Sequence, residues 1–484
     1  MRFNHRTALA LILVGALLLR VLPLTYSHFW DETVYLQDAK VIVDGRTNYD
    51  EFFERPPVLS LVYAAGFSVW DDIYVANLMQ GLFTTLAVLL AFLYVRRTFG
   101  VAAGVGAAFL LAFAPYFVET SHELMTDMPA VTLMLAAMWL FDKSGARYAL
   151  LAGVAFALAA ETRFTSLFLG LYFLLEVAWE RWRFSRLVPL GIGTAATLAP
   201  YLVWLKGRYG SFLYPFVLAR RIVHEWTAPV PADFYLHGVL GVLPPSLWAA
   251  IALAVVLLLR SALPGTRDTA PGETSGESAQ QIRRQVTLLL WGGAFFAYML
   301  SIPHKEIRYL LPLAIPAVVL GGVAIGWLGQ WLARQATPLQ TAGVLLGVVV
   351  AAVDYGSPVR ALASGPLVDR SESPEVQVAL YLRDHSSPAD TVYAAHNFPV
   401  LAFYSERRTV SLLPIQQDFE RRQCELMSKP GWFVYFLPEH IGEIHARDPA
   451  LKPDRAFLAA HTNFTPLQHF TTATVYRYEP RCGS

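Results

Sequence analysis

The sequence predicts an α-helical, polytopic membrane protein that continues into a small soluble α/β domain. Hydrophobic residues make up 55% of the 484 positions and charged residues only 15%, whereas soluble domains carry about 25% charged residues. Apolar runs long enough to cross a bilayer recur from the N-terminus and stop after residue 356. The formal net charge of +1 gives no indication of a nucleic-acid partner.

Hydropathy predicts about eleven membrane-spanning helices, because each span needs about 20 mainly apolar residues. Two of the spans, 128–141 and 148–160, are short for a bilayer, and we expect them to extend into their flanks. The complete set of predicted spans is 7–26, 75–95, 101–118, 128–141, 148–160, 164–179, 187–205, 240–259, 286–302, 309–330 and 339–354.

The orientation follows from the basic residues in short loops. Residues 1–24 have the basic start and apolar centre of a signal peptide, but no small-x-small cleavage pattern follows, so we expect a retained first helix. Basic residues gather in alternate connections, which places the N-terminus in the cytoplasm. One outer loop departs from this rule and suits anion binding, because it contains Lys206, Arg208, Arg220 and Arg221. We expect a multi-pass protein of the plasma membrane.

Composition divides the chain into a transmembrane domain, 1–356, and an extracytoplasmic domain, 371–484. Within the first, a stretch rich in Gly, Ser, Thr and Pro predicts a flexible cytoplasmic loop at about 261–285. The second opens on a helix-like stretch, "SPEVQVALYLRDH". Short β-like runs follow it: "DTVYAAH", "RTVSLL", "GWFVYFLP" and "ATVYRYEP". Its two cysteines, Cys424 and Cys482, have no metal-binding or redox spacing, and both a disulfide and two free thiols remain open.

Charged residues near the membrane are costly and are often functional. Four clusters of them are predicted on the outer surface, beside helix ends. They are Asp31, Glu32, Glu54 and Arg55 in the first outer loop, Asp127 in the second, Glu161 and Arg163 in a tight turn, and His304, Lys305, Glu306 and Arg308 in the fifth.

The first outer loop also has the pattern of interfacial helices. Tyr35, Ala39, Ile42 and Val43 recur at helical spacing, which suits a helix that lies along the membrane surface. A second helix is expected from Pro57, in "PVLSLVYAAGFSVW". Two such helices would cover a cavity lined by carboxylates and guanidinium groups.

Each cluster also has a plainer interpretation. Asp31 and Glu32 could be solvated loop acids, and Asp127 could simply favour a helix N-terminus. Glu161 and Arg163 could form an ion pair within their turn, and the "HKEIR" run could be an interfacial anchor. We favour a shared site because all four clusters are predicted on one face.

The residue types indicate a substrate with a phosphate head and an apolar tail. Carboxylates supply a general base or bind a cation, and Arg and Lys bind phosphate. The chain contains neither the P-loop pattern nor a Rossmann glycine fingerprint. A site on the outer face is also remote from cytosolic nucleotides. Both points favour a lipid-linked donor over a nucleotide-linked one.

Several motifs resemble a known class of enzyme. The stretch "FWDETVYLQDAKVIVDGRTNYDEFFERPPVLSLVY" resembles the first outer loop of GT-C glycosyltransferases that use polyprenyl-phosphate sugars. The protein O-mannosyltransferase and aminoarabinose (lipid A) transferase families are the most similar. "ELMTDMPAV" resembles the second-loop Asp motif and "AAETRFTSL" the small-residue turn, while "HKEIRYLLP" resembles a signature of lipid-linked mannosyltransferases. The resemblance covers residues 1–330.

The resemblance implies inverting transfer of mannose, or a related hexose or pentose, from a polyprenyl- or dolichyl-phosphate carrier to a hydroxyl of a glycan, lipid or protein. It implies that Asp31 is the general base, with Glu32 and Asp127 as further catalytic residues. Basic residues would bind the lipid phosphate, and Glu32, Glu54 and Asp127 would orient the sugar or hold a divalent cation. The residues implied for the phosphate are Arg55, Arg163, Lys305 and Arg308, with His304 and Glu306 beside them.

Two departures from the family leave the subfamily and the sugar open. Arg55 and Arg163 stand where the family often has other basic residues, and the "HKE-x-R" run belongs to another branch than the first loop. The alternative functions are a transporter or lipid-linked-glycan flippase, and a scaffold that presents the C-terminal domain. A transporter should place its polar residues near the bilayer midplane rather than at helix ends.

Overall fold

The computed structural model describes residues 5–45, 54–180, 184–225, 230–231, 233–262, 275–335, 354–440 and 453–481. It divides into two compact units. The first contains Met1–Pro23 and Leu78–Leu367, and the second contains Leu24–Asn77 and Val368–Ser484. The segment that follows the first helix therefore belongs with the C-terminal region, a grouping that composition did not indicate.

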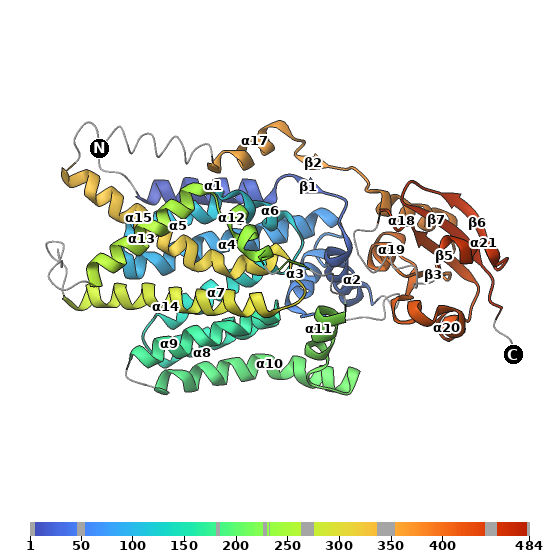
Figure 1. Ribbon diagram of the computed structural model, residues 1–484, viewed down its shortest axis with the longest axis horizontal. Coiled ribbons are helices and arrows are strands. Elements are labelled where there is room, and N and C mark those ends of the chain that lie inside the picture. Colours follow the sequence, from blue (N-terminus) through green and yellow to red (C-terminus); the bar gives the residue numbers. More distant parts are fainter. Residues whose placement is uncertain are drawn as a thin grey trace. The chain divides into compact units, whose positions relative to one another are not determined.

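The first unit is helical throughout its described part (Figure 1). Apolar runs form its helices, and Pro or Gly often stands where one helix gives way to the next. The elements are α1 (His5–Val21), α4 (Ile73–Phe99, which begins in the second unit), α5 (Val101–Phe113), α6 (Pro115–His122), α7 (Asp127–Phe141), α8 (Ala146–Ala160), η1 (Phe164–Phe168), α9 (Leu169–Trp179), η2 (Phe184–Arg186), α10 (Leu187–Tyr209), α11 (Tyr214–Glu225), α12 (Phe234–Val242), α13 (Pro245–Ala262), α14 (Ser275–Ser301), η3 (Ile307–Leu313), α15 (Ala314–Gln335) and α17 (Ser357–Ser364).

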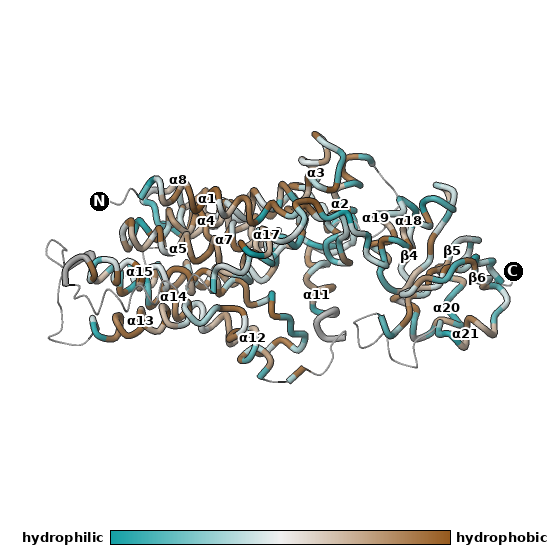
Figure 2. Tube along the Cα trace, turned by 90° about the horizontal axis from the view of Figure 1, so that it is seen from above, coloured by the Kyte–Doolittle hydropathy of each residue, from teal (hydrophilic) through white to brown (hydrophobic). Residues whose placement is uncertain are grey.

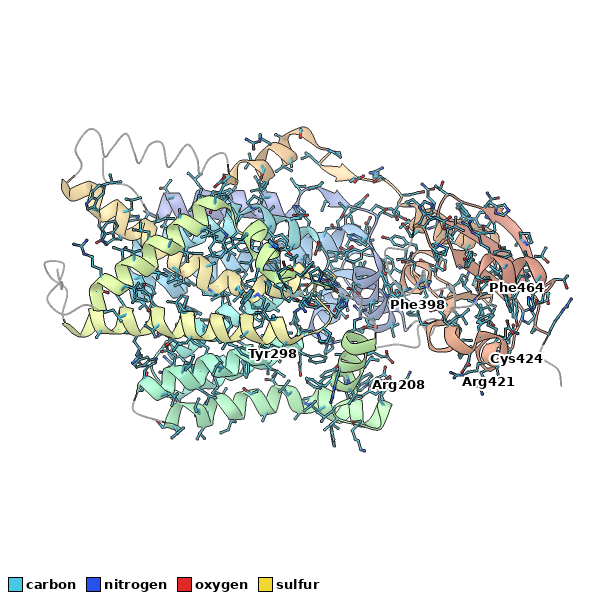
Figure 3. All side chains as sticks on the ribbon, in the orientation of Figure 1. Arg208, Tyr298, Phe398, Arg421, Cys424 and Phe464 are labelled. Carbon is cyan, nitrogen blue, oxygen red and sulfur yellow. The ribbon has the colours of Figure 1, made fainter. Side chains whose placement is uncertain are left out.

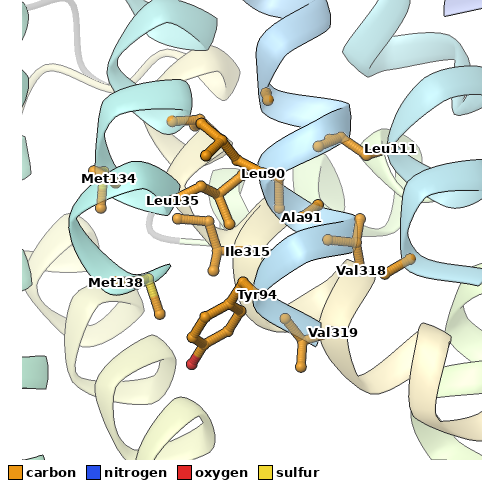
Figure 4. Packing of buried hydrophobic residues seen from close by; sticks show 14 of the residues in the cluster. Leu90, Ala91, Tyr94, Leu111, Met134, Leu135, Met138, Ile315, Val318 and Val319 are labelled. Atoms are coloured by element: carbon orange, nitrogen blue, oxygen red, sulfur yellow. The ribbon is translucent and has the colours of Figure 1, made fainter. Parts of the chain in front are cut away.

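The core of this unit lies where α4, α5, α7 and α15 meet. Figure 4 shows Leu90 and Tyr94 of α4 close to Met138 of α7 and Ile315 of α15. These side chains are buried, and such cores are packed as densely as organic crystals. One of the predicted site residues, Asp127, is the first residue of α7 and so begins a helix of this core.

Glycines let α8 and α10 run side by side (Figure 1). A Cβ added at Gly153 would overlap the carbonyl oxygen of Leu190, and one added at Gly193 would overlap that of Leu150. Small residues at helix contacts are typical of membrane helices, because there packing rather than hydrophobicity drives association.

Three helices of the described part are long and apolar enough to cross a membrane: Ile73–Phe99, Phe184–Tyr209 and Ile307–Leu332. Two bent helix pairs bring the number to five if each pair counts as one span. Figure 2 shows apolar residues, in brown, in the region of the helices labelled α1, α4 and α7. The predicted number of about eleven is not confirmed, since several apolar helices are shorter, and span 339–354 lies almost wholly outside the described residues.

The second unit contains a mixed five-stranded sheet in the order β4-β3-β5-β7-β6. Strand β3 pairs in parallel with β4 and β5, and β7 pairs antiparallel with β5 and β6. All four predicted runs form strands, and only β6, which contains Pro466, was missed. The strands are β3 (Thr391–Ala394), β4 (Arg408–Ser411), β5 (Gly431–Phe436), β6 (Phe464–His469) and β7 (Ala473–Tyr478).

Short helices accompany this sheet, and the predicted helix "SPEVQVALYLRDH" is present as α18. Its first turn is capped, because Ser373 accepts a hydrogen bond from the N–H of Val376. Cys424 of α20 is disulfide-bonded; the other cysteine, Cys482, lies outside the described residues. The helices are α18 (Pro374–His385), α19 (Phe398–Ser405), η4 (Leu413–Asp418), α20 (Phe419–Leu426) and α21 (Arg455–Ala460).

The first outer loop forms helices where they were predicted, at α2 (Trp30–Asp44) and α3 (Val58–Phe67). Helix α2 packs against α19, with the rings of Trp30 and Phe398 5.3 Å apart. Just before α2, β1 (Leu24–Thr25) pairs in parallel with β2 (Val368–Asp369). The carboxylates of this loop therefore belong to the same compact unit as the C-terminal sheet.

Candidate active site

The sequence-predicted site residues fall into two groups, one in each unit. The second unit contains Asp31, Glu32, Glu54 and Arg55, and the first contains all the others.

Asp31 and Glu32 are adjacent but have different neighbours. Glu32 is buried, 5% exposed, and it accepts a 2.9 Å hydrogen bond from the backbone N–H of Phe29, the residue before α2. Its other oxygen lies 3.1 Å from His28 Nδ1. A carboxylate in the first turn satisfies a free helix N–H and interacts favourably with the helix dipole. Glu32 therefore fixes the start of α2.

Asp31 points toward the guanidinium group of Arg55. Arg55 Nη1 lies 2.6 Å from Asp31 Oδ1, and both side chains are partly exposed. The guanidinium also lies over the ring of Tyr35, at 5.9 Å. Glu54 stands beside Arg55 in the bend before α3. This loop therefore places a carboxylate and a cation together at a partly open position.

In the first unit, Asp127 and Arg163 form an ion pair, with Arg163 Nη1 3.0 Å from Asp127 Oδ1. Asp127 is the first residue of α7 and is almost completely buried. Arg163 precedes η1 and also donates a 3.2 Å hydrogen bond to Thr126 Oγ1. The helix dipole of α7 adds to the stabilisation of the Asp127 charge.

The "HKEIR" run is organised by Glu306, the residue before η3. Its carboxylate lies 2.8 Å from His304 Nε2, accepts a 3.0 Å hydrogen bond from the Tyr309 hydroxyl and pairs with Arg308. Lys305 Nζ donates to the carbonyl of Ile302 at 3.0 Å. The run is therefore a folded cluster of alternating charge.

One aromatic ring joins these two groups. The guanidinium of Arg163 lies 5.0 Å from the centre of the Tyr309 ring, and the hydroxyl of that ring binds Glu306. Three of the four predicted clusters thus meet within the first unit, at the ends of α7, α8 and α14. The first-loop cluster belongs to the other unit.

The alternative pairing of Arg163 with Glu161 is not observed. Arg163 instead forms its ion pair with Asp127, which is 36 positions earlier in the chain. Glu161 instead ends α8 as a buried carboxyl, 7% exposed, and burial raises its pKa from 4.5 to about 7. The carboxyl therefore changes charge near neutral pH.

Sequence reasoning missed several contacting residues. Tyr309, which bridges two clusters, directly follows the "HKEIR" run, and His28 lies four positions before Glu32, so adjacency and helical spacing are the available signals. Tyr404 had no such signal: its hydroxyl donates to the Tyr26 carbonyl at 2.6 Å and accepts from the His28 N–H at 3.0 Å.

The four cations predicted in a basic outer loop lie on helices, Lys206 and Arg208 in α10 and Arg220 and Arg221 in α11. Arg208, labelled in Figure 3 at the end of α10, lies over the ring of Tyr209, at 5.9 Å. Lys206 lies at a similar distance from the ring of Phe212. Anion binding by this loop stays a prediction.

No group of three or more His, Cys, Asp or Glu side chains with metal-binding geometry occurs among the residues that the structure describes. Glu54 and Asp127, the two candidate metal ligands, belong to different units. A divalent cation at either residue also stays a prediction.

Comparison with known proteins identifies the fold. Residues 54–204 match the family model of dolichyl-phosphate-mannose-protein mannosyltransferases. No curated protein matches the chain in sequence. Among solved structures, the chain is similar to ArnT from Cupriavidus metallidurans bound to undecaprenyl phosphate, with a TM-score of 0.67 and 15% identity. That likeness covers 98% of this chain and 97% of ArnT.

Two further structures support the same fold. The archaeal oligosaccharyltransferase AglB from Archaeoglobus fulgidus, in complex with an inhibitory peptide and a dolichol-phosphate, gives a TM-score of 0.62 at 12% identity, covering 96% of this chain and 72% of AglB. The mycobacterial arabinofuranosyltransferase AftD gives 0.55 at 13% identity, covering 99% of this chain and 40% of AftD. The chain has the fold of the GT-C membrane glycosyltransferases, and the resemblance predicted from its motifs is confirmed.

Proposed function

We propose that the protein is a membrane glycosyltransferase that moves a sugar from a polyprenyl- or dolichyl-phosphate carrier to an acceptor hydroxyl, with inversion, on the extracytoplasmic face. The observation that carries this proposal is the cluster of Asp127, Arg163, Tyr309, Glu306 and Arg308 in a chain with the GT-C fold. Two similar structures, ArnT and AglB, are described with a lipid phosphate bound.

The chemistry needs a base and a cationic site. The acceptor oxygen attacks the anomeric carbon, its proton passes to a carboxylate, and the bond between that carbon and the phosphate oxygen breaks. The leaving lipid phosphate thereby gains one negative charge. Preorganised cations that meet this developing charge lower the barrier, because the charge is larger in the transition state than in the bound donor.

The described contacts suit these roles. Asp31 is partly exposed and held by Arg55, so an acceptor hydroxyl can approach its carboxylate; we assign it the role of base. Arg163 lies over the Tyr309 ring, and Arg308 pairs with Glu306, which accepts the hydrogen bond of the Tyr309 hydroxyl. Both arginines are assigned to the lipid phosphate, together with Lys305, which precedes Glu306 in the chain. Asp127 holds Arg163 in place, and Glu32 holds the first turn of α2.

The position of the charged groups favours an enzyme over a transporter. Asp127 begins α7, Arg163 precedes η1 and Glu306 precedes η3, so all three stand at helix ends. Transporter sites typically lie near the bilayer midplane, on broken helices. Flux of the lipid carrier across liposomes, measured on the same preparation as sugar transfer, separates the two functions.

The test is transfer of a labelled sugar from undecaprenyl phosphate to a panel of glycan, lipid and peptide acceptors, with the purified full-length protein. We expect Asp31→Asn and Asp127→Asn to lower the rate by a factor of about 100 or more. Asp384→Asn, at an exposed side chain that pairs with the adjacent Arg383, is the matched control. Wild-type rates from both site variants would refute the assignment of these residues.

A further inference from the structure

The turn that follows α8 contains an unusual group of buried polar atoms. Within six consecutive residues, four side-chain atoms make no hydrogen bond to any residue that the structure describes. They are Glu161 Oε1, Arg163 Nε, Thr165 Oγ1 and Ser166 Oγ. Buried polar atoms in native proteins are nearly always paired, so each exception needs a reason.

Glu161 is the most unfavourable of the four. It stands at the carbonyl end of α8, where the helix dipole already concentrates negative charge. It is buried as well, and no ion pair with Arg163 or any other described cation compensates it. A residue chosen for folding alone would not be acidic here, and unfavourable side chains of this kind concentrate at functional sites.

Ser166 provides a second unused polar group, a hydroxyl that can donate a hydrogen bond. Ser166 is 1% exposed, and its hydroxyl makes no hydrogen bond to a described residue. Thr162 shows that a hydroxyl in this turn can bond back to the helix, because it donates to the Leu158 carbonyl at 2.7 Å. The turn therefore offers one acceptor and several donors that the protein itself does not use.

Resting on the proposed function, we propose that Glu161 and Ser166, at the two ends of this turn, form the subsite for the sugar of the lipid-phosphate donor, in which Glu161 accepts a hydrogen bond from a sugar hydroxyl and Ser166 donates one. A sugar presents donors and acceptors side by side, as this set of atoms requires. Arg163, which is assigned to the phosphate, stands between these two residues in the sequence and also pairs with Asp127. The turn is thereby positioned to hold the sugar next to its phosphate.

The proposal predicts discrimination between two ligands that differ only in the sugar. Binding of undecaprenyl phosphate alone does not use this subsite, whereas binding of a mannosyl or arabinosyl undecaprenyl phosphate does. A site built to bond a hydroxyl strongly rejects a ligand that lacks it. Loss of one such bond to a charged group corresponds to about a tenfold or larger loss of affinity.

The experiment measures equilibrium binding of both ligand types to the purified full-length protein in nanodiscs. Glu161→Ala and Ser166→Ala should weaken binding of the preferred sugar-bearing donor about tenfold and leave undecaprenyl phosphate unchanged. Thr162→Ser, which keeps its bond to the helix, is the matched control. A donor that lacks the contacted hydroxyl should bind the wild type and Glu161→Ala equally well, because neither complex contains the hydrogen bond between Glu161 and the sugar.

The possible results separate the subsite from the proposed function. Equal weakening of both ligands would assign the turn to the phosphate or to folding, and unchanged binding of both would remove it from the site; either result overturns the proposal. A wild type that binds and transfers from none of the sugar-bearing donors would overturn the proposed function, and the subsite with it.

Discussion

At the residue scale, neighbouring carboxyl groups in this protein have separate tasks. Asp31 and Glu32 are consecutive, yet one pairs with Arg55 at a partly exposed position and the other is buried at the start of α2. The difference follows from helix geometry, because successive side chains in a first turn point in different directions. One of two adjacent acids can therefore act as the proposed base while the other stabilises the helix that carries it.

Glu32→Ala should destabilise the second unit, because it removes an acceptor for the Phe29 N–H and the partner of Nδ1 of the buried His28. We expect a loss of about 1 kcal/mol, as for other helix caps. Asp31→Asn should cost less than that, since partly exposed ion pairs contribute little, while it lowers the transfer rate by a factor of about 100 or more. Thermal unfolding of both variants, measured beside transfer rates, checks the contrast; equal stability losses would contradict it.

Glu161 should make stability depend on pH. Its pKa is raised from 4.5 in the unfolded chain to about 7 in the folded protein by burial, so the folded state holds the proton more tightly. The stabilisation is complete below pH 4.5 and is lost as pH rises toward 7 and above. The melting temperature of the wild type should therefore fall between pH 5 and 8 relative to Glu161→Gln. Identical pH profiles for the two proteins would contradict the prediction.

At the element scale, short 3-10 helices and close helix contacts place the site. Segments η1 and η3 follow Arg163 and Glu306 directly, and each turns the chain into the next helix, α9 or α15. The helices themselves are positioned by small residues, above all between α8 and α10. The turn that carries Glu161 and Arg163 thus depends on how closely α8 approaches its neighbours.

Gly153→Val should destabilise the helical unit, because the added side chain would collide with the backbone of α10 at Leu190. Overpacking of this kind typically costs about 1–3 kcal/mol. Gly191→Ala is the control, since that position faces open space and an alanine favours the helix. Melting temperatures in one detergent measure both effects. A Gly153→Val protein as stable as the wild type would show that the two helices can separate without cost.

At the scale of the whole molecule, the chain is organised in two units that do not follow sequence order. The first outer loop leaves the helical unit and joins the C-terminal sheet region, through the β1–β2 pair and the packing of α2 on α19. The proposed base, Asp31, therefore depends on a region that could otherwise be taken for a separate appendage.

Tyr404→Phe tests this dependence, because the Tyr404 hydroxyl bonds to both Tyr26 and His28 next to α2. Leaving these backbone groups unpaired costs about 1–3 kcal/mol. We expect faster amide exchange in residues 24–45 and slower transfer. Tyr381→Phe is the control, as its hydroxyl makes no hydrogen bond within the described part of the chain. Unchanged exchange in residues 24–45 would mean that the loop folds without the C-terminal region.

Many of the helices and strands can be predicted from short stretches of the sequence. The helices α2, α3 and α18 and the strands β3, β4, β5 and β7 stand where the sequence predicts them, because apolar periodicity and turn residues act over a few positions. Strand β6 escaped prediction because a proline interrupts its pattern. The charged site residues could also be selected from the sequence, because charged residues are rare beside long apolar runs.

The sequence by itself determined many of the helices and strands, the GT-C resemblance and the residue types of the candidate site. Only the tertiary structure decided which residues pair: Arg163 with Asp127, and Tyr404 with His28 across 376 positions. It also decided that the first outer loop belongs with the C-terminal sheet. The physical reason is that pairing of distant charges and loops depends on how helices and sheets pack, and that packing leaves no periodic trace in the chain.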